Sequence, residues 1–383
     1  MRIGVPRETM AGERRVALVP ESCKKLIQAG YNITLEAEAG QAAGFPDSAY
    51  REVGVSVEAD PGAVIQTGDL VLKVNPPVRR EQGNEAEWMR PGAIYLGSLM
   101  PLRNLDAVRA LADRGVTAFS TDAIPRTTRA QSMDTLSSMA SIAGYKGALL
   151  AATELNKYFP MLMTAAGTVP PAKVFVIGAG VAGLQAIATS RRLGANVFAT
   201  DVRPEVKEQI ESVGGKYVGV EFSDGASGGG GYARELTDEE KARQRDLLAA
   251  QCTQSDAVIT TALIGGVFAP RLISASMVKS MRPGTVIVDL AADGGGNCEL
   301  SRPGENFTVD GISILAPLNL PTTMPLHASL LFSRNLTAFV LAFTKDKVFR
   351  VDLSDDIQQG AVITHEGAVK HQRTQDALQK AGT

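Results

Sequence analysis

The chain has 383 residues, of which 44% are apolar and 21% charged, with a formal net charge of −2 and a pI near 6.0. A chain of this length exceeds what one hydrophobic core usually supports, so we expect two domains. The near-neutral charge balance excludes the broad basic surface that binds phosphate backbones, and we expect no nucleic-acid partner.

The three cysteines lie far apart and form no CxxC pair, which indicates a reducing compartment and predicts no metal site. Charge at Arg7 and Glu8 interrupts the start of the chain before an apolar stretch of signal-peptide length develops, so we expect no export signal. The longest apolar run near the C-terminus, 336–343, is far shorter than the ~20 residues of a membrane-spanning helix. We therefore expect any membrane connection to come through a partner.

Up to residue 120, short runs rich in Val and Ile alternate with helix-like stretches, which is the pattern of βαβ units in a parallel sheet. Pro20 and Gly30 mark the ends of one intervening helix, and Asn104 and Gly115 mark those of another. The expected strands are 2–5, 33–36, 70–74, 93–96 and 116–120.

A long helix is expected over 134–159, a proline-free stretch rich in Ala, Leu, Met and Ser. After the loop TAAGTVPP a second alternating set begins, and Thr237 with Glu240 forms a capping box for a later helix. A final helix over 327–343 has no strand partner of its own, so we expect it to return to the first domain. The tail from Lys345 on indicates only possible hairpin strands. The strands of the second set are expected at 173–177, 196–200, 217–220, 257–261, 285–290 and 312–316.

These patterns predict an α/β protein with two Rossmann-like, doubly wound parallel-sheet domains joined by long helices. The first domain is expected to be discontinuous, comprising 1–133 plus 327–383. The second is expected to span 134–326, including the linking helix.

The strongest local signal is KVFVIGAGVAG, where Gly178, Gly180 and Gly183 follow an apolar strand and open the helix 181–193. The first glycine permits the tight turn, the second lets a pyrophosphate approach the backbone, and the third allows helix and strand to pack closely. The helix N-terminus adds free N–H groups and the positive end of its dipole. The alternative is a purely structural glycine turn.

Asp201 ends the next expected strand, NVFAT, at the position where an acidic residue binds the ribose hydroxyls of a dinucleotide. Its charge repels a 2′-phosphate, whereas the nearby Arg203 could attract one, and we expect NAD rather than NADP. The alternatives are that Asp201 is an ordinary loop carboxylate and that Arg203 is a solvated residue before a helix starting at Pro204. With two such domains, an NAD cleft is expected between them.

Several longer motifs resemble one family, the NAD(H)-binding alpha subunit of proton-translocating transhydrogenase, over nearly the full length. The resemblance implies a homodimeric component that binds NAD(H) and works with a membrane proton-channel component and a separate NADP(H)-binding component, without which it is inactive. It further implies direct hydride transfer between NADH and NADP+, coupled to proton translocation, at the cytoplasmic face of the inner membrane. The motifs are MRIGVPRE, RAQSMDTLSSMASIAGY, TAAGTVPPAKVFVIGAGVAGLQAIATSRRLGA, TDVRPEVKEQIES, ITTALI and VIVDLAADGGGNCE.

The resemblance also implies site residues. Arg126, Asp134 and Ser137 are expected against the nicotinamide of NAD(H), and Gln131 is expected to face the NADP(H) nicotinamide held by the partner. By residue type alone, Asp134 could instead cap the long helix, and Arg126 and Arg129 could be surface charges. The expected cofactor-binding residues are Gly178, Gly180, Val181, Ala182, Gly183, Asp201, Val202, Arg203, Thr261, Ala262 and Leu263, together with Tyr232 on the glycine-rich segment 223–235. That segment is expected to be a lid over NAD(H), the alternative being a mere linker.

The main alternative function is an alanine dehydrogenase, whose substrate-binding Arg and Lys match Arg15 and Lys73 and one of whose aspartates matches Asp293. That reaction moves a proton with the hydride and needs a general acid or base, a histidine in that family. The stretch IYLGSLMPLRN, where it should lie, contains none. Transhydrogenation relies on positioning and needs no such group. A non-enzymatic NAD(H) sensor is the third class, against which the RAQSMD loop argues.

Overall fold

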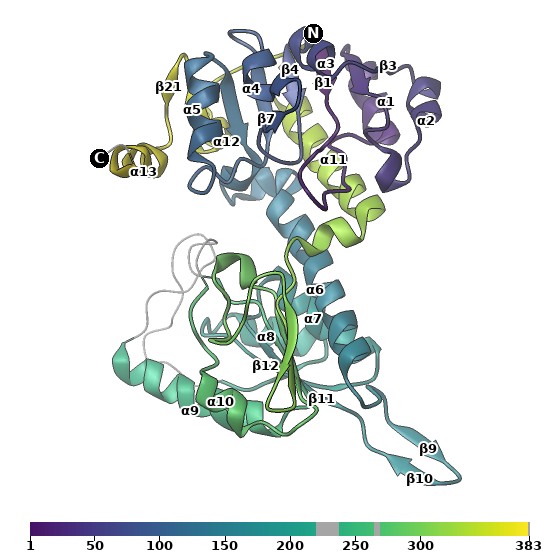
Figure 1. The fold of residues 1–383 in the computed structure, drawn as a ribbon, viewed down its shortest axis with the longest axis vertical. Helices are drawn as coiled ribbons and strands as arrows, with labels where there is room; N and C mark the ends of the chain where they lie inside the picture. The colour runs from purple at the N-terminus through teal and green to yellow at the C-terminus, as the bar shows by residue number, and fades with distance from the viewer. Residues whose placement is uncertain (220–236, 264–268, 382–383) are drawn as a thin grey trace. The chain divides into compact units, whose positions relative to one another are not determined.

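The computed structural model describes residues 1–219, 237–263 and 269–381 of the chain (Figure 1). Its internal contacts divide the chain into two compact units. The first unit contains Met1–Met139 and Pro321–Thr383, and the second contains Ala140–Leu320. Each unit is an α/β domain built on its own, mainly parallel sheet.

An eight-stranded sheet forms the centre of the first unit. Its strands are β1 (Arg2–Val5), β2 (Asn32–Glu36), β3 (Ser56–Glu58), β4 (Leu70–Leu72), β7 (Ile94–Gly97), β8 (Thr117–Ser120), β20 (Val362–His365) and β21 (Ala368–Val369). They lie in the order β21-β20-β8-β7-β4-β1-β2-β3. All pairs from β3 to β8 are parallel and follow the doubly wound order, whereas β20 and β21 are antiparallel additions at the edge beside β8.

Helices from both ends of the chain surround this sheet. Phe339 of the helix after residue 320 packs against Phe119 of β8 with ring centroids 5.5 Å apart, and the N–H of Val16 donates to the hydroxyl of Ser329 at 3.0 Å. The C-terminal segment therefore completes the first core. The helices are α1 (Pro20–Gln28), α2 (Asp47–Glu52), α3 (Pro61–Thr67), α4 (Glu85–Trp88), α5 (Leu105–Asp113), α11 (Pro325–Ala342), α12 (Asp356–Ala361) and α13 (Gln372–Ala381), and two small hairpins pair β5 (Arg79–Arg80) with β6 (Gly83–Asn84) and β18 (Thr344–Lys345) with β19 (Val348–Phe349).

A seven-stranded sheet forms the centre of the second unit. Its strands are β11 (Lys173–Ile177), β12 (Asn196–Thr200), β13 (Lys216–Tyr217), β14 (Ala257–Thr260), β15 (Val286–Asp289), β16 (Asn306–Val309) and β17 (Ile312–Leu315). They lie in the order β13-β12-β11-β14-β15-β17-β16, with β16 as an antiparallel edge.

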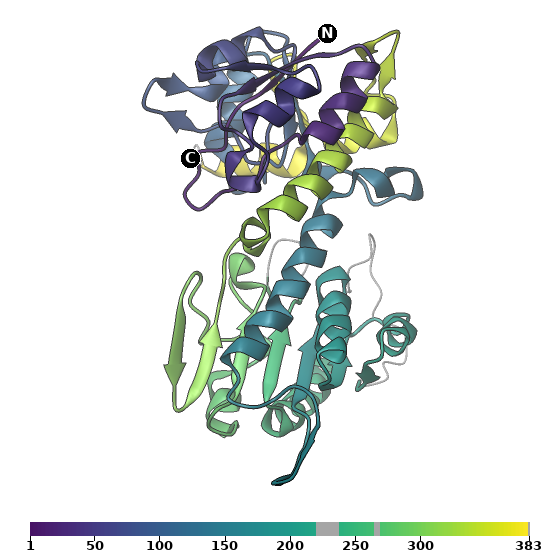
Figure 2. The same cartoon turned by 90° about the vertical axis from the view of Figure 1, so that its right-hand side faces the viewer.

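Alternate residues of β11 point to opposite faces of this sheet, so each face has its own apolar core. Val174 and Val176 pack with α6 and α7, whereas Phe175 and Ile177 pack with α9 and α10. Figure 2 shows α6 running across one face of the sheet. The helices are α6 (Thr135–Glu154), which enters this unit at Ala140, α7 (Val181–Arg192), α8 (Val206–Ser212), α9 (Asp238–Gln254) and α10 (Ala275–Ser280). Among the helices of the described ranges, none is both long enough and apolar enough to cross a membrane.

The expected fold class is confirmed, and most expected strands end within two residues of the observed ones. The capping box is also confirmed, because Thr237 Oγ1 accepts from the N–H of Glu240 while the Glu240 carboxylate accepts from the N–H of Thr237. Both sheets also contain strands that the sequence did not indicate, β3 and β16. The strand expected at 217–220 is reduced to the two residues of β13 within the described chain.

Three local predictions were wrong. The loop TAAGTVPP instead forms a hairpin of β9 (Leu162–Thr164) and β10 (Gly167–Val169), whose turn uses the left-handed φ of Gly167. The long helix ends at Glu154 rather than 159, and the chain after it places Leu155 and Phe159 in the apolar core beside β11. Asn104 precedes α5 as expected but does not cap it with its side chain, since its Nδ2 donates to the carbonyl of Leu99.

A chain of buried ion pairs joins the strand ends of the first unit. The Nζ of Lys73 lies 2.9 Å from the carboxylate of Glu85 and 3.4 Å from that of Glu8, with the side chains of Lys73 and Glu85 completely buried. Arg80 pairs with Glu85 at 2.7 Å and with Glu36 at 2.9 Å. Burial raises the pKa of Glu8, while the charge of Lys73 acts in the opposite direction. Such groups tolerate burial only as a matched set.

Glu85→Gln is expected to lower the free energy of unfolding by about 3–5 kcal/mol, because the amide keeps the shape but leaves two buried cations with one counter-ion fewer. Glu21→Gln is the matched control, since Glu21 pairs with Lys25 and Arg334 at the exposed surface, where a pair contributes about 1 kcal/mol or less. Urea denaturation measures both. Equal losses in the two variants would contradict the assigned role of the buried network.

Candidate dinucleotide-binding site

Glycine shapes the turn between β11 and α7. Gly178 has a left-handed φ of +89°, and its N–H donates to the carbonyl of Thr200 at 2.9 Å. A Cβ at this position would lie 2.9 Å from Oγ1 of Thr261 and 3.1 Å from the backbone nitrogen of Ala262. Glycine alone combines this φ with so close an approach of neighbouring atoms.

The two later glycines of the turn differ in what a side chain would meet. A Cβ on Gly183 would lie 1.9 Å from the carbonyl oxygen of Gly178, so this glycine lets α7 pack against the turn. A Cβ on Gly180 would meet no atom of the described residues within 4 Å, and its φ of −73° suits any residue. A purely structural turn therefore explains Gly178 and Gly183 but not Gly180. Open space beside the first turn of a twelve-residue helix is what an approaching phosphate requires.

Asp201 follows β12 and lies beside the glycine turn. Its Oδ2 accepts from the N–H of Ala179 at 2.8 Å and from Nη2 of Arg203 at 2.8 Å. Its Oδ1 accepts from the N–H and Nε of Arg203 at 3.0 and 2.9 Å. Burial alone would raise the pKa of Asp201, but the bonds and charge of Arg203 and the Ala179 N–H outweigh it, so the pKa is lowered.

Arg203 is therefore not the solvated residue that the sequence allowed as an alternative. Its side chain is 17% exposed and that of Asp201 is 7% exposed, and together they form a largely buried pair. Asp201 is likewise no ordinary loop carboxylate, because it accepts a hydrogen bond from the backbone N–H of Ala179 in the glycine turn.

The predicted residues after β14 close the other side of the turn. The hydroxyl of Thr261 donates to the carbonyl of Gly178 at 2.9 Å. The side-chain amide of Asn297 accepts from the N–H of Ala262 and donates to its carbonyl, both at 2.9 Å, and also donates to the carbonyl of Pro270. Asn297 is completely buried. Asn297 thus fixes the backbone of Ala262, one of the residues predicted to bind the cofactor.

A second buried carboxylate organises the loop that carries Asn297. Asp289, at the end of β15, accepts from the hydroxyls of Thr260 and Ser301 and from the N–H groups of Ala291 and Cys298. Neither Asp289 nor Asn297 was predicted from the sequence. A charged residue ending the apolar run VIV was a usable signal for the first, whereas Asn297 was visible only as one letter of a family motif.

The remaining predicted cofactor residues line the same turn or lie outside the described chain. Val181 and Leu263 are 41% and 38% exposed, which is high for apolar side chains and leaves both available for contact. Ala182 lies against α6, because a Cβ on Gly144 would come 2.0 Å from its carbonyl oxygen. Val202, which lies between Asp201 and Arg203 in the sequence, is partly buried. Tyr232 and the segment 223–235 lie outside the described residues.

The predicted nicotinamide residues belong to the first unit. The carboxylate of Asp134 accepts from the N–H of Ser137 at 2.8 Å and from its hydroxyl at 2.6 Å, directly before α6 begins. Asp134 therefore has the capping role that its residue type suggested, and it also orients Ser137. Arg126 and Gln131 are exposed. Arg129 is a surface charge paired with Asp355 and Asp356 at the start of α12.

Both cations that match substrate residues of alanine dehydrogenases are already paired inside the first unit. Arg15 donates from Nε and Nη2 to the two oxygens of Glu13 at 2.8 and 2.6 Å, and both side chains are buried. Burial would raise the pKa of Glu13, but Arg15 and the amide of Asn75 lower it to about 2. Lys73 lies within the buried ion-pair chain. Asp293 is exposed in a short 3-10 turn.

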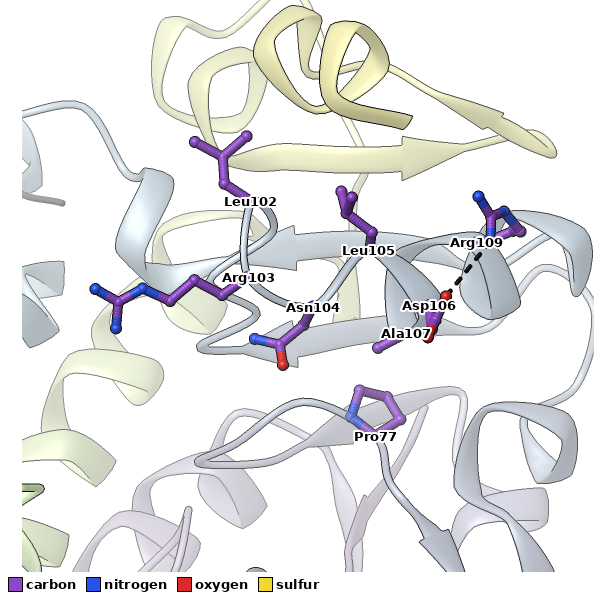
Figure 3. Close-up of a pocket in the computed structure, with 8 residues that line it drawn as sticks. All are labelled: Pro77, Leu102, Arg103, Asn104, Leu105, Asp106, Ala107 and Arg109. Carbon is purple, nitrogen blue, oxygen red and sulfur yellow. Dashed lines mark hydrogen bonds and ion pairs between the residues drawn. The ribbon is translucent and has the colours of Figure 1, made fainter. Parts of the chain in front are cut away.

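Two hollows of about 510 Å³ each lie in the first unit. One is lined in part by Arg7, Glu8, Arg14 and Glu38. The other, shown in Figure 3, is lined by Pro77 and by residues around the start of α5, where Arg109 pairs with Asp106. Neither hollow is lined by a residue predicted to bind the cofactor or to act in catalysis, as far as the described chain extends.

A pair of glycine substitutions separates the structural and ligand-binding roles of the turn. Gly183→Ala is expected to lower the thermal midpoint markedly, because its methyl group overlaps the Gly178 carbonyl. Gly180→Ala is expected to leave the midpoint within a few degrees of the native value yet weaken NADH binding about tenfold or more, because its methyl occupies the space that a phosphate needs. Thermal melts and NADH titrations measure the two effects. Unchanged NADH binding in Gly180→Ala would leave the turn without a ligand role.

Comparisons with known proteins place this geometry in a family. Residues 4–143 match the family described as alanine dehydrogenase/PNT, N-terminal domain, and residues 147–372 match alanine dehydrogenase/PNT, C-terminal domain. An NAD(P) transhydrogenase alpha subunit of Rhodospirillum rubrum is 43% identical over 376 residues, which cover 97% of this chain and 98% of that protein.

Solved structures agree with the sequence relatives. The crystal structure of transhydrogenase from Sinorhizobium meliloti matches with a TM-score of 0.86 and 42% identity, covering 96% of this chain and all of that one. An L-alanine dehydrogenase structure matches with a TM-score of 0.82 at 25% identity, covering 99% of each chain. The chain therefore belongs to the alanine dehydrogenase/PNT family and, within it, to the NAD(P) transhydrogenase alpha subunits.

Proposed function

We propose that this chain is the NAD(H)-binding component of a proton-translocating nicotinamide nucleotide transhydrogenase. The observation that carries the proposal is the glycine turn, where the fold requires Gly178 and Gly183 but leaves open space beside Gly180. A protein whose turn served only packing would have no need of the middle glycine. The identity of 43% to a transhydrogenase alpha subunit supports the same assignment.

In this proposal, the pyrophosphate of NAD(H) lies against the N–H groups of the first turn of α7. The backbone can come close because Gly180 has no side chain, and the positive end of the helix dipole favours the phosphate charge. Thr261 and Ala262 keep this turn in place through their bonds to Gly178 and Asn297. The exposed Val181 and Leu263 offer apolar contact, and Asp201 offers its carboxylate to the adenosine ribose.

The nicotinamide end is assigned to the polar segment of the first unit. Arg126, Asp134 and Ser137 orient the nicotinamide of NAD(H), with the Asp134 carboxylate fixing the hydroxyl of Ser137 at 2.6 Å. Gln131 is exposed and faces the nicotinamide that the partner supplies. NADH supplies a hydride, a hydrogen with both bonding electrons, which passes directly to NADP+ on the partner. The protein needs to position the two rings and supplies no proton there.

The alanine dehydrogenase alternative is not favoured by the polar groups present. Its chemistry needs a proton acceptor near the nicotinamide, and the stretch IYLGSLMPLRN instead has Ser98, whose hydroxyl donates to Asp122 at 3.0 Å. The guanidinium of Arg15 already binds a carboxylate of its own chain, that of Glu13. A bare NAD(H) sensor is disfavoured because it has no use for the exposed polar residues Gln131 and Ser132 of the RAQSMD segment.

We further propose that the subunit is a homodimer that joins an NADP(H)-binding component and a membrane proton-channel component, at the cytoplasmic face of the inner membrane. Support for the homodimer comes from the hairpin of β9 and β10, which extends from the second unit in Figure 1. Met163 is 81% exposed there, and Tyr158 and Met161 at its base are also exposed. A two-stranded hairpin is marginal by itself, and clustered exposed apolar side chains mark association surfaces.

Mixing the protein with an NADP(H)-binding transhydrogenase component is expected to produce hydride transfer from NADH to an NADP+ analogue, followed by absorbance. Neither protein alone should do so, because each holds one nicotinamide. Under the same conditions with NAD+ and L-alanine, the chain is expected to give no NADH at any pH. Steady alanine oxidation without transfer in the mixture would replace this function with the dehydrogenase.

Gln131→Asn is expected to slow hydride transfer in the mixture by up to about a hundredfold while NADH binding stays nearly unchanged, since small misplacements of reacting rings are costly in rate. Stopped-flow kinetics measures the rate of hydride transfer, and NADH titration measures the binding affinity. Thr128→Ser, a conservative change in the same exposed 3-10 segment, is the control. A parallel fall in binding and rate would instead make Gln131 an NADH ligand or a structural residue.

A further inference from the structure

The carboxylate of Asp201 has no acceptor position left over. A carboxylate offers about four lone-pair directions, and Asp201 accepts four hydrogen bonds, two at each oxygen. Two come from backbone N–H groups, those of Ala179 and Arg203, and two from the Arg203 guanidinium. The ribose hydroxyls that a carboxylate at this position is expected to bind are also donors. They compete for places that are already filled.

Of the four hydrogen bonds to Asp201, the two from the guanidinium come from a side chain and can be exchanged without a change in the backbone path. The N–H of Ala179 belongs to the glycine turn, and the N–H of Arg203 belongs to the turn after β12, so both are tied to the backbone path. The guanidinium stands at the end of a flexible side chain that is still 17% exposed.

We propose that Arg203 determines the cofactor specificity of this site by competing with the ribose hydroxyls for Asp201. This inference rests on the proposed NAD(H) site. NADH binds by displacing the guanidinium from the carboxylate, so its affinity is reduced by the cost of that exchange. A 2′-phosphate meets the same guanidinium as a cation that it can bind, so Arg203 also offsets part of the repulsion from Asp201.

The two effects have opposite signs, which distinguishes competition for Asp201 from a purely structural role of Arg203. Removing Arg203 frees the carboxylate for the hydroxyls and removes the cation that favours the phosphate. NADH binding should therefore tighten and NADPH binding should weaken. A residue that served only structure, or one that contacted a part common to both dinucleotides, would shift both affinities in the same direction.

Neighbouring charges supply a control. Lys207 lies over the ring of Tyr217 at 5.9 Å from its centroid, and the Tyr217 hydroxyl donates to the backbone carbonyl of Asp201 at 3.4 Å. Lys207 is thus a nearby cation without a hydrogen bond to the carboxylate. Lys207→Ala tests the general field of a positive charge, whereas Arg203→Ala tests occupation of the carboxylate itself.

The experiment titrates the full chain with NADH and with NADPH, each by ligand fluorescence, and records the thermal midpoint of every variant. Arg203→Ala is expected to bind NADH about three- to tenfold more tightly and NADPH about tenfold more weakly, each change no larger than one charge-assisted hydrogen bond can supply. Arg203→Lys keeps the charge without the planar fork, so it should tighten NADH binding while leaving NADPH binding near the native value. Lys207→Ala should change the NADH-to-NADPH ratio by less than about twofold.

Asp201→Asn supplies the reverse test, because it releases Arg203 and removes the negative charge. NADPH should then bind about tenfold more tightly and NADH more weakly. An unchanged ratio in Arg203→Ala, or weaker binding of both dinucleotides, would overturn the competition while leaving the site intact. Absence of NADH binding by the native protein would overturn the proposed function itself. If Arg203→Ala melts early, Arg203→Lys carries the test alone.

Discussion

The contact between Gly183 of α7 and the carbonyl oxygen of Gly178 is the constraint on which the second unit depends. A methyl group there would lie 1.9 Å from the oxygen, so helix and strand end can approach this closely only without one. The approach leaves the Gly178 oxygen free to accept from Thr261, which joins the end of β14 to the same turn. Asp201 and Asn297 then hold the two sides by backbone hydrogen bonds.

Much of this arrangement was predictable, because the signals were local. Glycine spacing, an acidic residue at the next strand end and alternating apolar runs each act within a few residues, and they predicted both sheets and the turn. Asn297 could not be predicted in the same way. Its partners, Ala262 and Pro270, lie 35 and 27 residues away in sequence, and an asparagine within GGGNC is equally typical of a surface turn.

Charged residues were the hardest to interpret from sequence. Solvation was the alternative interpretation of Arg203, because arginine is usually solvated, yet Arg203 forms a largely buried pair with the carboxylate of Asp201 two residues away. Lys73 resembled a substrate ligand in a related family, but it is completely buried and paired with Glu8 and Glu85. A charged side chain is buried only where the fold places a counter-ion beside it. The positions of counter-ions depend on the whole chain and cannot be read from neighbouring residues. The L-alanine dehydrogenase structure shares this fold, and a fold by itself does not fix the reaction that a protein supports.

The discontinuity of the first unit has a consequence for how the protein is made. Its sheet is nearly complete by Ser120, but two partners of early residues are synthesised only after residue 320. Phe339 packs against Phe119, and the hydroxyl of Ser329 accepts from the N–H of Val16. The second unit, Ala140–Leu320, is continuous and leaves the ribosome before that segment does. Domains usually fold as they emerge, the N-terminal one first. Here the order is reversed, because the middle of the chain can finish folding while the beginning still exposes the apolar face that the C-terminal segment later covers.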